Sequence, residues 1–365
     1  MPGIYIHIPF CAVKCPYCDF YSLPARPARM DAYLAALLSE ISTAPDGLTA
    51  DTVYFGGGTP VLFGEKRLAA VLAVLERKFS FSGGCEITLE ANPFTLPLSL
   101  YRELFEVGFN RISFGMQSAV PKELRALGRL QGPEQMERAV ESARQAGFSN
   151  LSADLMLGIP HQNMESMQTS IRFIETLELQ HLSAYLLKIE EGTAFARSKP
   201  DCPDEDAVCD LYLSAVEQLE SLGLHQYEIS NFAKPGFESR HNLKYWRREE
   251  YLGFGPAAHS FYKGVRTAHP RDLDGYIRTG GQDRFVTDPG DSPAAEELML
   301  RLRLREGADV SAIAPEQAEA VFRRAAPLQK AGLLTQQGGR IALTPKGFLV
   351  SNAIIAELTL PLDRG

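Results

Sequence analysis

The sequence predicts an α/β fold, in which a closed or partly closed parallel β/α barrel of the TIM type precedes a small C-terminal α+β domain. From Gly3 to about Ser230, apolar β-branched runs alternate with amphipathic helices, a pattern that implies parallel strands joined by right-handed crossovers. Six or more such units favour a barrel over an open doubly wound sheet, because no Gly-x-Gly-x-x-Gly turn opens the first unit. The C-terminal part shows a different pattern, of helices and one hairpin.

The barrel elements follow from the period of their apolar residues, which is two in a strand and about 3.6 in a helix. On the first strand, Ile4, Ile6 and Ile8 share one face and Tyr5 and His7 share the other, so we interpret His7 as a core histidine. The predicted strands are Ile4–Ile8, Thr52–Gly56, Glu86–Ala91, Arg111–Met116, Ala153–Gly158, His181–Leu187 and a candidate seventh at Tyr227–Ser230. The clearest connecting helices are Met30–Ile41, Lys66–Phe79, Pro133–Ala146 and Asp206–Leu222.

We assign residues 1–265 to the barrel, 266–293 to a connector rich in Asp, Gly and Pro, and 294–365 to the C-terminal domain. Two helices, Ala294–Leu304 and Pro315–Ala331, precede a hairpin at Leu334–Leu343, and Pro345 opens a last helix. This order resembles a winged-helix domain. Its positive and negative charges nearly balance, so we expect it to cover the barrel rather than to read DNA.

Charge and hydropathy limit the function classes. The chain has 365 residues, a net charge of −8 and a pI near 5.5, which argues against broad attraction to nucleic acid or anionic lipid. The first strand begins at Gly3, which leaves no room for a signal peptide, and no apolar run is long enough to span a bilayer. We therefore expect a cytoplasmic protein, in which Cys85, Cys202 and Cys209 are structural thiols.

Three cysteines follow the first strand at the spacing C-x3-C-x2-C, namely Cys11, Cys15 and Cys18. Thiolates on one short loop suit an iron–sulfur cluster, zinc or copper(I). A structural zinc site needs a fourth protein ligand, for which only His7 and Asp19 lie nearby. A [4Fe–4S] cluster held by three cysteines instead keeps one iron open, and we favour it over zinc and over plain buried thiols.

This motif, with an aromatic residue before its last cysteine, resembles the radical S-adenosylmethionine (SAM) superfamily. The flanking residues Tyr5-Ile-His-Ile-Pro-Phe and Pro-Tyr-Cys-Asp-Phe20 are similar to its oxygen-independent coproporphyrinogen III oxidase-like branch. The resemblance implies a [4Fe–4S] cluster, bound SAM and an electron donor for the cluster. An open iron can chelate the amino and carboxylate groups of SAM, and one electron then cleaves its sulfonium bond.

The resemblance also implies the SAM-binding residues. The segment Gly56-Gly-Gly-Thr-Pro60 matches the turn that binds the methionine amino group, and the next motifs match the ribose and neighbouring contacts. A carboxylate such as Glu90 could also be simply solvated. The implied SAM residues are Tyr5, Tyr17, Gly57, Gly58, Thr59, Glu90, Gln117, Arg129 and Asp154.

Two functional classes within this branch compete. The coproporphyrinogen dehydrogenase usually has an N-terminal extension and a fourth cysteine two residues after the third, whereas this chain has Phe20 there. The haem chaperone class is similar at these points and shares the segment His241-Asn-Leu-Lys-Tyr-Trp246. We therefore predict a protein that binds haem as cargo and passes it to a recipient haem apoprotein. A membrane contact is expected only through that recipient, and whether SAM is cleaved stays open.

For haem itself, His241 is the predicted axial ligand, and Tyr245 and Trp246 are predicted to line the pocket. The alternative is that His-Asn fixes a turn while Tyr and Trp pack beneath it. His259, which follows the small residues Ala257 and Ala258, is the second candidate ligand.

Overall fold

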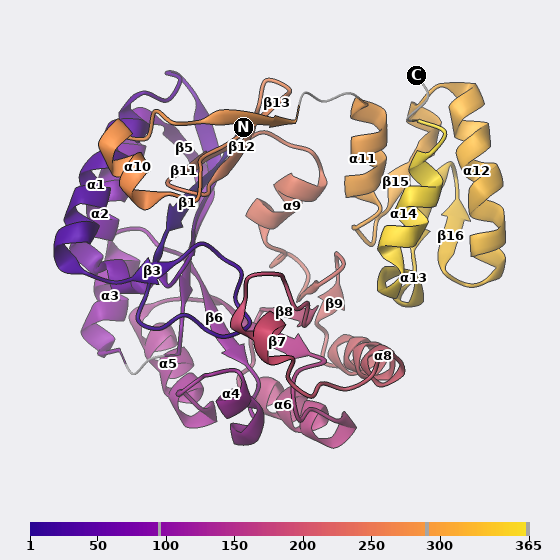
Figure 1. Cartoon of the computed structure of the whole chain (residues 1–365), viewed down its shortest axis with the longest axis horizontal. Coiled ribbons are helices and arrows are strands. Elements are labelled where there is room, and N and C mark those ends of the chain that lie inside the picture. The colour runs from indigo at the N-terminus through magenta and orange to yellow at the C-terminus, as the bar shows by residue number, and fades with distance from the viewer. Residues whose placement is uncertain (94–95, 289–291, 363–365) are drawn as a thin grey trace.

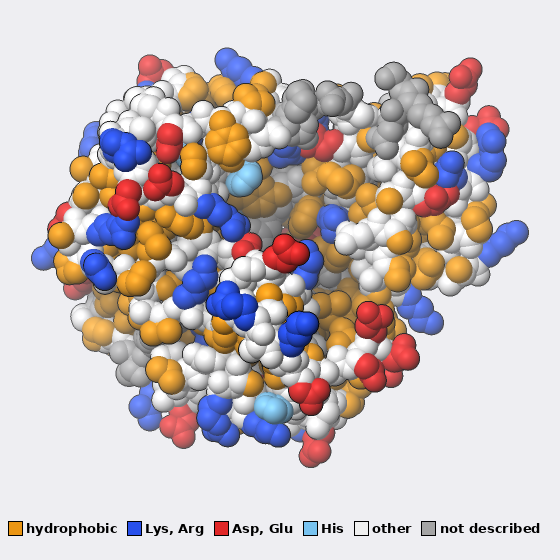
Figure 2. Space-filling view, viewed as in Figure 1, with side chains coloured by type: hydrophobic (Ala, Val, Ile, Leu, Met, Phe, Trp, Pro, Cys, Tyr) orange, Lys and Arg blue, Asp and Glu red, His pale blue; other side chains and the backbone are white. Residues whose placement is uncertain are grey.

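The computed structural model describes residues 1–93, 96–288 and 292–362. One large curved sheet carries helices on its outer face, and a small helical domain lies beside it (Figure 1). Figure 2 shows this face of the molecule hollowed between the two parts, with hydrophobic side chains in the hollow. No helix in the described part of the chain is both long and apolar enough to cross a membrane.

Six strands form the parallel part of the barrel in chain order, from β1 to β8. They are β1 (Gly3–Ile8), β4 (Thr49–Gly57), β5 (Ser80–Ala91), β6 (Arg111–Gln117), β7 (Asn150–Leu157) and β8 (His181–Leu186). The helices of this part are α1 (Pro27–Ser42), α2 (Glu65–Lys78), α3 (Leu98–Glu106), α4 (Pro121–Ala126), α5 (Pro133–Ala146), α6 (Met164–Thr176), α7 (Ala194–Ser198) and α8 (Glu205–Ser221), with a 3-10 turn at Pro60–Phe63. All six firmly predicted strands and the four helices predicted here are confirmed, with ends shifted by up to six residues.

The alternation on β1 separates the core from the barrel interior. Ile4, Ile6 and Ile8 have no exposed surface and belong to the main hydrophobic core under the helices. Tyr5 and His7 point to the opposite face. The strand thereby anchors the barrel through its isoleucines and presents polar rings to the inside.

Helix ends agree with local sequence signals. Asp204 caps α8 by accepting a hydrogen bond from Ala207 N at 2.8 Å, and Asn163 and Ser166 form a capping box at the start of α6. Pro133 begins α5, and Gly147 ends it with a left-handed φ of 113°. Such signals explain why α5 was predicted with its exact bounds.

The barrel is partly closed. Beyond β1 the sheet continues through β11 (Tyr251–Phe254), which is parallel to β1, and then through the antiparallel strands β12 (His259–Tyr262), β13 (Val265–Ala268) and β14 (Phe285–Asp288). Beyond β8 it continues through β10 (Asn231–Ala233) and β9 (His225–Gln226). The edge strands of the described sheet are β14 and β9, and they are not paired with each other.

Two predictions about this region need correction. Tyr227–Ser230 is no strand, since β9 ends before it and β10 begins after it, with a single bridge between Glu228 and Leu304. Residues 266–293 were predicted to be a connector, but they contain the end of β13, helix α10 (Leu273–Thr279) and β14. Short strands bounded by Gly, Pro and Asp carry too few residues for their period to be visible.

The C-terminal domain contains α11 (Pro293–Arg301), α12 (Pro315–Lys330), α13 (Pro345–Leu349), α14 (Ser351–Thr359) and a sheet of β15 (Ala308–Asp309), β17 (Arg340–Leu343) and β16 (Leu334–Gln337), with a 3-10 turn at Val310–Ala312. The two predicted helices and the hairpin are confirmed. This domain contacts the barrel part through α9 (Arg240–Trp246) and α8, where the Arg303 guanidinium lies 5.7 Å from the centre of the Trp246 ring.

Next to the cysteine loop, β2 (Phe10–Cys11) pairs with β3 (Leu23–Pro24).

Candidate functional site

A cavity of about 600 Å³ lies where the parallel strands end. Every barrel strand from β4 to β8 contributes side chains to it, and the cysteine loop covers one side. Carboxyl ends of parallel strands are where such folds place their chemistry. Of the residues predicted from sequence, the cavity brings together Cys11, Cys15, Cys18, Tyr17, Gly57, Gly58, Thr59, Glu90, Gln117, Arg129 and Asp154.

The cysteine loop is anchored at both ends. Phe10–Cys11 pairs with β3, and a turn joins Cys18 N to Cys15 O at 3.2 Å. Between them Pro16 packs against Gly128, where an added Cβ would lie 2.9 Å from the proline ring. The three half-buried thiols therefore face one cavity from a fixed loop.

The thiols share the cavity without forming a tight cluster. Among residues 1–93, 96–288 and 292–362, no three His, Cys, Asp or Glu side chains are grouped closely enough to hold a metal ion. In a [4Fe–4S] cluster each thiolate binds a different iron, so its ligands need not group around a single ion. Their chemistry fits that cluster, since three thiolates from one loop leave one iron free for another ligand.

The glycine turn after β4 approaches this loop through its backbone. Gly58 N donates to Ile8 O at 2.9 Å, and Thr59 N donates to Phe10 O at 2.8 Å. A Cβ on Gly58 would lie 2.6 Å from Phe10 O, and Gly57 has a φ of +107°. Only glycine fits both positions, because a side chain at Gly57 would meet His7 and one at Gly58 would meet the Phe10 backbone, so the turn packs directly against β1 and β2 beside the cysteines.

A chain of hydrogen bonds joins the turn, the end of β5 and the cysteine loop. The Thr59 hydroxyl donates to Cys11 Sγ at 3.6 Å and accepts from Asn92 Nδ2 at 3.1 Å. Asn92 Oδ1 accepts from Arg129 Nη1 at 2.5 Å, and the Arg129 guanidinium also donates to the Tyr17 hydroxyl at 2.8 Å. Sequence reasoning missed Asn92, although it stands two residues after Glu90 on the same alternating face of a strand end.

Two carboxylates line the inner wall of the cavity. Burial raises the pKa of Glu90 to about 7, and burial likewise raises the pKa of Asp154 to about 6. Glu90 accepts a hydrogen bond from the Tyr54 hydroxyl at 2.8 Å. Carboxylates held at this depth are suited to accept hydrogen bonds from hydroxyl or amino groups of a ligand.

Gln117 lines the same cavity from the end of β6. Its backbone is left-handed, with a φ of 70°, and its side-chain oxygen accepts from the Tyr185 hydroxyl at 2.7 Å. An unfavourable backbone conformation of a non-glycine residue is typical of functional positions. Tyr185, like Tyr54, was missed from sequence, but each belongs to the inward face of its strand.

Tyr5 is the predicted SAM residue that does not line this cavity. Its ring stacks on that of Tyr54, with centroids 6.2 Å apart, and it lines a second cavity instead. Its hydroxyl is 3.1 Å from His7 Nδ1, and His7 Nε2 is 2.9 Å from Tyr21 O. The interpretation of His7 as a core histidine with satisfied nitrogens agrees with this geometry.

The structure does not support His241 as a haem ligand. Its side chain has no exposed surface, and its ring nitrogens lie 2.8 Å from the hydroxyls of Thr52 and Tyr245. Both nitrogens are thus engaged within the barrel, and burial lowers the pKa of the imidazole to about 3. The alternative named from sequence, a packing role for this motif, describes His241 better.

The other residues of this motif point in different directions. Trp246 lies at the boundary with the C-terminal domain, against Arg303. Tyr245 lines the second cavity, where its ring meets Tyr251 edge-on at 4.6 Å. Of the histidines suggested as haem ligands, only His259 lines that cavity and is exposed.

Comparisons with known proteins agree with this architecture. The family model of the radical SAM superfamily matches residues 5–174, and that of the HemN C-terminal domain matches residues 289–350. The haem chaperone HemW of Mycobacterium tuberculosis H37Rv is 34% identical over 376 residues, which cover 98% of this chain and 94% of that protein. The haem chaperone HemW of Bacillus subtilis 168 is also 34% identical and covers 97% and 98% of the two chains.

A solved structure shares the whole fold. Coproporphyrinogen III oxidase (HemN) from Escherichia coli, described as a radical SAM enzyme, superposes with a TM-score of 0.85 and covers 100% of this chain and 90% of its own. Its sequence is 24% identical, so this likeness concerns the fold alone. The predicted fold class, a β/α barrel with an added C-terminal domain, is confirmed.

Proposed function

Because the chain belongs to the haem chaperone HemW family of radical SAM proteins, we propose that it carries a [4Fe–4S] cluster and SAM, binds haem, and delivers the haem to a recipient haem apoprotein. An electron donor for the cluster is part of this proposal. The observation that carries it is the cavity at the strand ends, where three thiols, a glycine turn and two half-buried carboxylates converge.

Each group in the cavity has a role in this proposal. Cys11, Cys15 and Cys18 would hold the cluster, whose chemistry when bound is the transfer of one electron to SAM. The backbone of Gly57 and Gly58, which line the cavity beside the cysteines, would take the polar end of the SAM methionine.

The carboxylates and the hydrogen-bonded chain complete the site. Glu90 and Asp154 face inward and would accept hydrogen bonds from the ligand. Asn92 and Arg129 would fix the cysteine loop against the turn, because their side chains connect Tyr17 to Thr59. These residues therefore orient the cofactors and do not react themselves.

The test compares two activities in one preparation. Cluster-loaded protein is titrated with haemin, and a second sample is incubated with SAM, a reductant and coproporphyrinogen III. We expect a saturable Soret change and no loss of coproporphyrinogen. Decarboxylation of coproporphyrinogen without saturable haem binding would contradict the proposal and would assign the chain to the oxidase class.

A further inference from the structure

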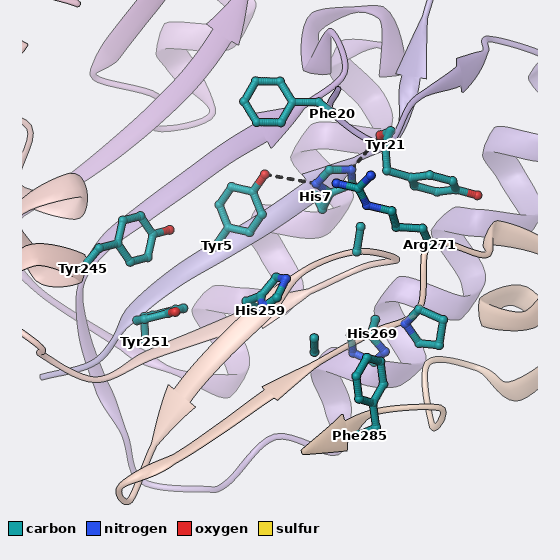
Figure 3. Close-up of a pocket in the computed structure, with 13 residues that line it drawn as sticks. Tyr5, His7, Phe20, Tyr21, Tyr245, Tyr251, His259, His269, Arg271 and Phe285 are labelled. Atoms are coloured by element: carbon teal, nitrogen blue, oxygen red, sulfur yellow. Dashed lines mark hydrogen bonds between the residues drawn. The ribbon is translucent and has the colours of Figure 1, made fainter. Parts of the chain in front are cut away.

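A second cavity, of about 580 Å³, lies beside the first. Its walls come from β1, the segment after the cysteine motif, and the sheet extension β11 to β14 (Figure 3). Phe20 and Arg271 line both cavities, so the two adjoin at these residues. The volume falls within the roughly 300–1,000 Å³ typical of sites for small molecules.

Aromatic rings make up much of the lining. Tyr5, Tyr245 and Tyr251 come from β1, α9 and β11, and in Figure 3 they lie on one side of His259. Phe20 and Phe285 are 68% and 49% exposed, although exposure of such large apolar side chains to water is unfavourable. Flat apolar surface of this kind is what a planar macrocycle can cover.

Three imidazoles line the cavity, but two are engaged within the protein. The ring nitrogens of His7 are hydrogen-bonded to the Tyr5 hydroxyl and the Tyr21 carbonyl oxygen. His269 Nε2 is 2.7 Å from Glu40 and its Nδ1 is 2.9 Å from Asp283. Both rings are therefore fixed by hydrogen bonds on both nitrogens.

His259 differs from these two. It begins β12, is exposed, and no hydrogen bond joins its ring to another described residue. The backbone beside it is held by hydrogen bonds from Ala257 N to Pro270 O and from His269 N to Ala258 O.

Arg271 brings a positive charge to the rim. Its side chain is 60% exposed and forms an ion pair with Asp19 at 3.1 Å. A surface pair of this kind contributes little stability, so another carboxylate can replace Asp19. A guanidinium at the edge of an apolar pocket suits the carboxylate of an amphipathic ligand.

We propose that this second cavity is the haem site, with His259 as the axial ligand of the iron and Arg271 as the partner of a propionate. This inference rests on the proposed haem chaperone function and specifies its site. An apolar lining, one free imidazole and one replaceable cation together match a metal-bearing planar ring with carboxylate groups. Because the cavities adjoin, the cargo would lie next to the cysteine loop.

The test measures haemin binding by the cluster-loaded full chain and by His259→Ala. The matched control is His225→Ala, since His225 is another exposed histidine and lies outside both cavities. We expect His259→Ala to weaken haemin binding by at least about tenfold and to alter the Soret band, because even outer contacts of metal ligands are worth that much. Affinity for metal-free protoporphyrin should stay unchanged, and so should SAM binding.

A second pair of measurements tests Arg271. Arg271→Gln should weaken binding of haemin but not of haemin dimethyl ester, which has the same ring and iron without free carboxylates. If His259→Ala does not fold, His259→Met serves instead, because methionine also ligates haem iron and should give a different absorption spectrum.

The outcomes distinguish an error in the proposed haem site from an error in the proposed function. Failure of the parent protein to bind haemin would overturn the proposed function together with this site. Normal haemin affinity and an unchanged spectrum in His259→Ala or His259→Met, with binding intact in the parent, would overturn the site alone.

Discussion

Replacing Cys11, Cys15 and Cys18 together with alanine is expected to abolish the iron–sulfur cluster while the protein still folds. The parent protein, reconstituted without oxygen, should hold about four irons per chain and give an electron resonance signal that SAM perturbs. The triple variant should hold almost no iron, since it lacks all three thiols that line the cavity. The fold should survive because the three side chains are only half-buried at the cavity mouth.

The matched control uses Cys202 and Cys209, which are half-buried and do not line the cavity. Their alanine double variant should retain full iron content and the SAM-dependent signal. Stoichiometric zinc without iron in the parent protein would contradict the assignment of the three cysteines to a cluster.

Glu90→Ala is expected to lower SAM affinity by about ten- to a hundredfold, because a hydrogen bond to a charged group is worth roughly 1.5–3 kcal/mol. The pH dependence follows from the raised pKa of Glu90, about 7 in the ligand-free protein. Below that value the carboxyl is protonated and loses acceptor capacity, so SAM affinity of the parent should fall as pH decreases from about 8 to about 6.

Glu90→Gln is the control for this pH effect, because its amide keeps the shape and does not titrate. Equilibrium dialysis with SAM should show that the part of the pH dependence caused by Glu90 is lost in Glu90→Gln. Unchanged affinity in a folded Glu90→Ala protein would show that Glu90 does not contact SAM.

Long elements with clear periods could be predicted from sequence. Alternation of Ile4, Ile6 and Ile8 identified β1, and Pro133 and Gly147 marked the ends of α5. The extension β11 to β14 was missed because each strand has four residues and because the pairing that attaches the extension to the barrel, β11 with β1, joins segments some 250 residues apart. Such non-local pairing leaves no local signal.

The site was predicted unevenly for a similar reason. A glycine motif such as Gly57-Gly58 can be recognised from sequence, because only glycine allows this backbone to pack so closely against His7 and Phe10. The role of a histidine depends on its partners. His241 is bound by Thr52, which is 189 residues away, whereas His259 has no such partner among the described residues. The sequence could not distinguish the buried imidazole from the free one.

Transfer of haem to an apoprotein distinguishes a haem chaperone from a protein that only binds haem. The cluster-loaded protein is given one equivalent of haemin, separated from free haem, and mixed with the apo form of a haem protein, in the presence and absence of SAM. We predict that the Soret band of the acceptor grows as that of the donor falls. This transfer should be faster than transfer from haem bound to serum albumin. Haem that stays with the protein, or that reaches the acceptor no faster than from albumin, would contradict the account.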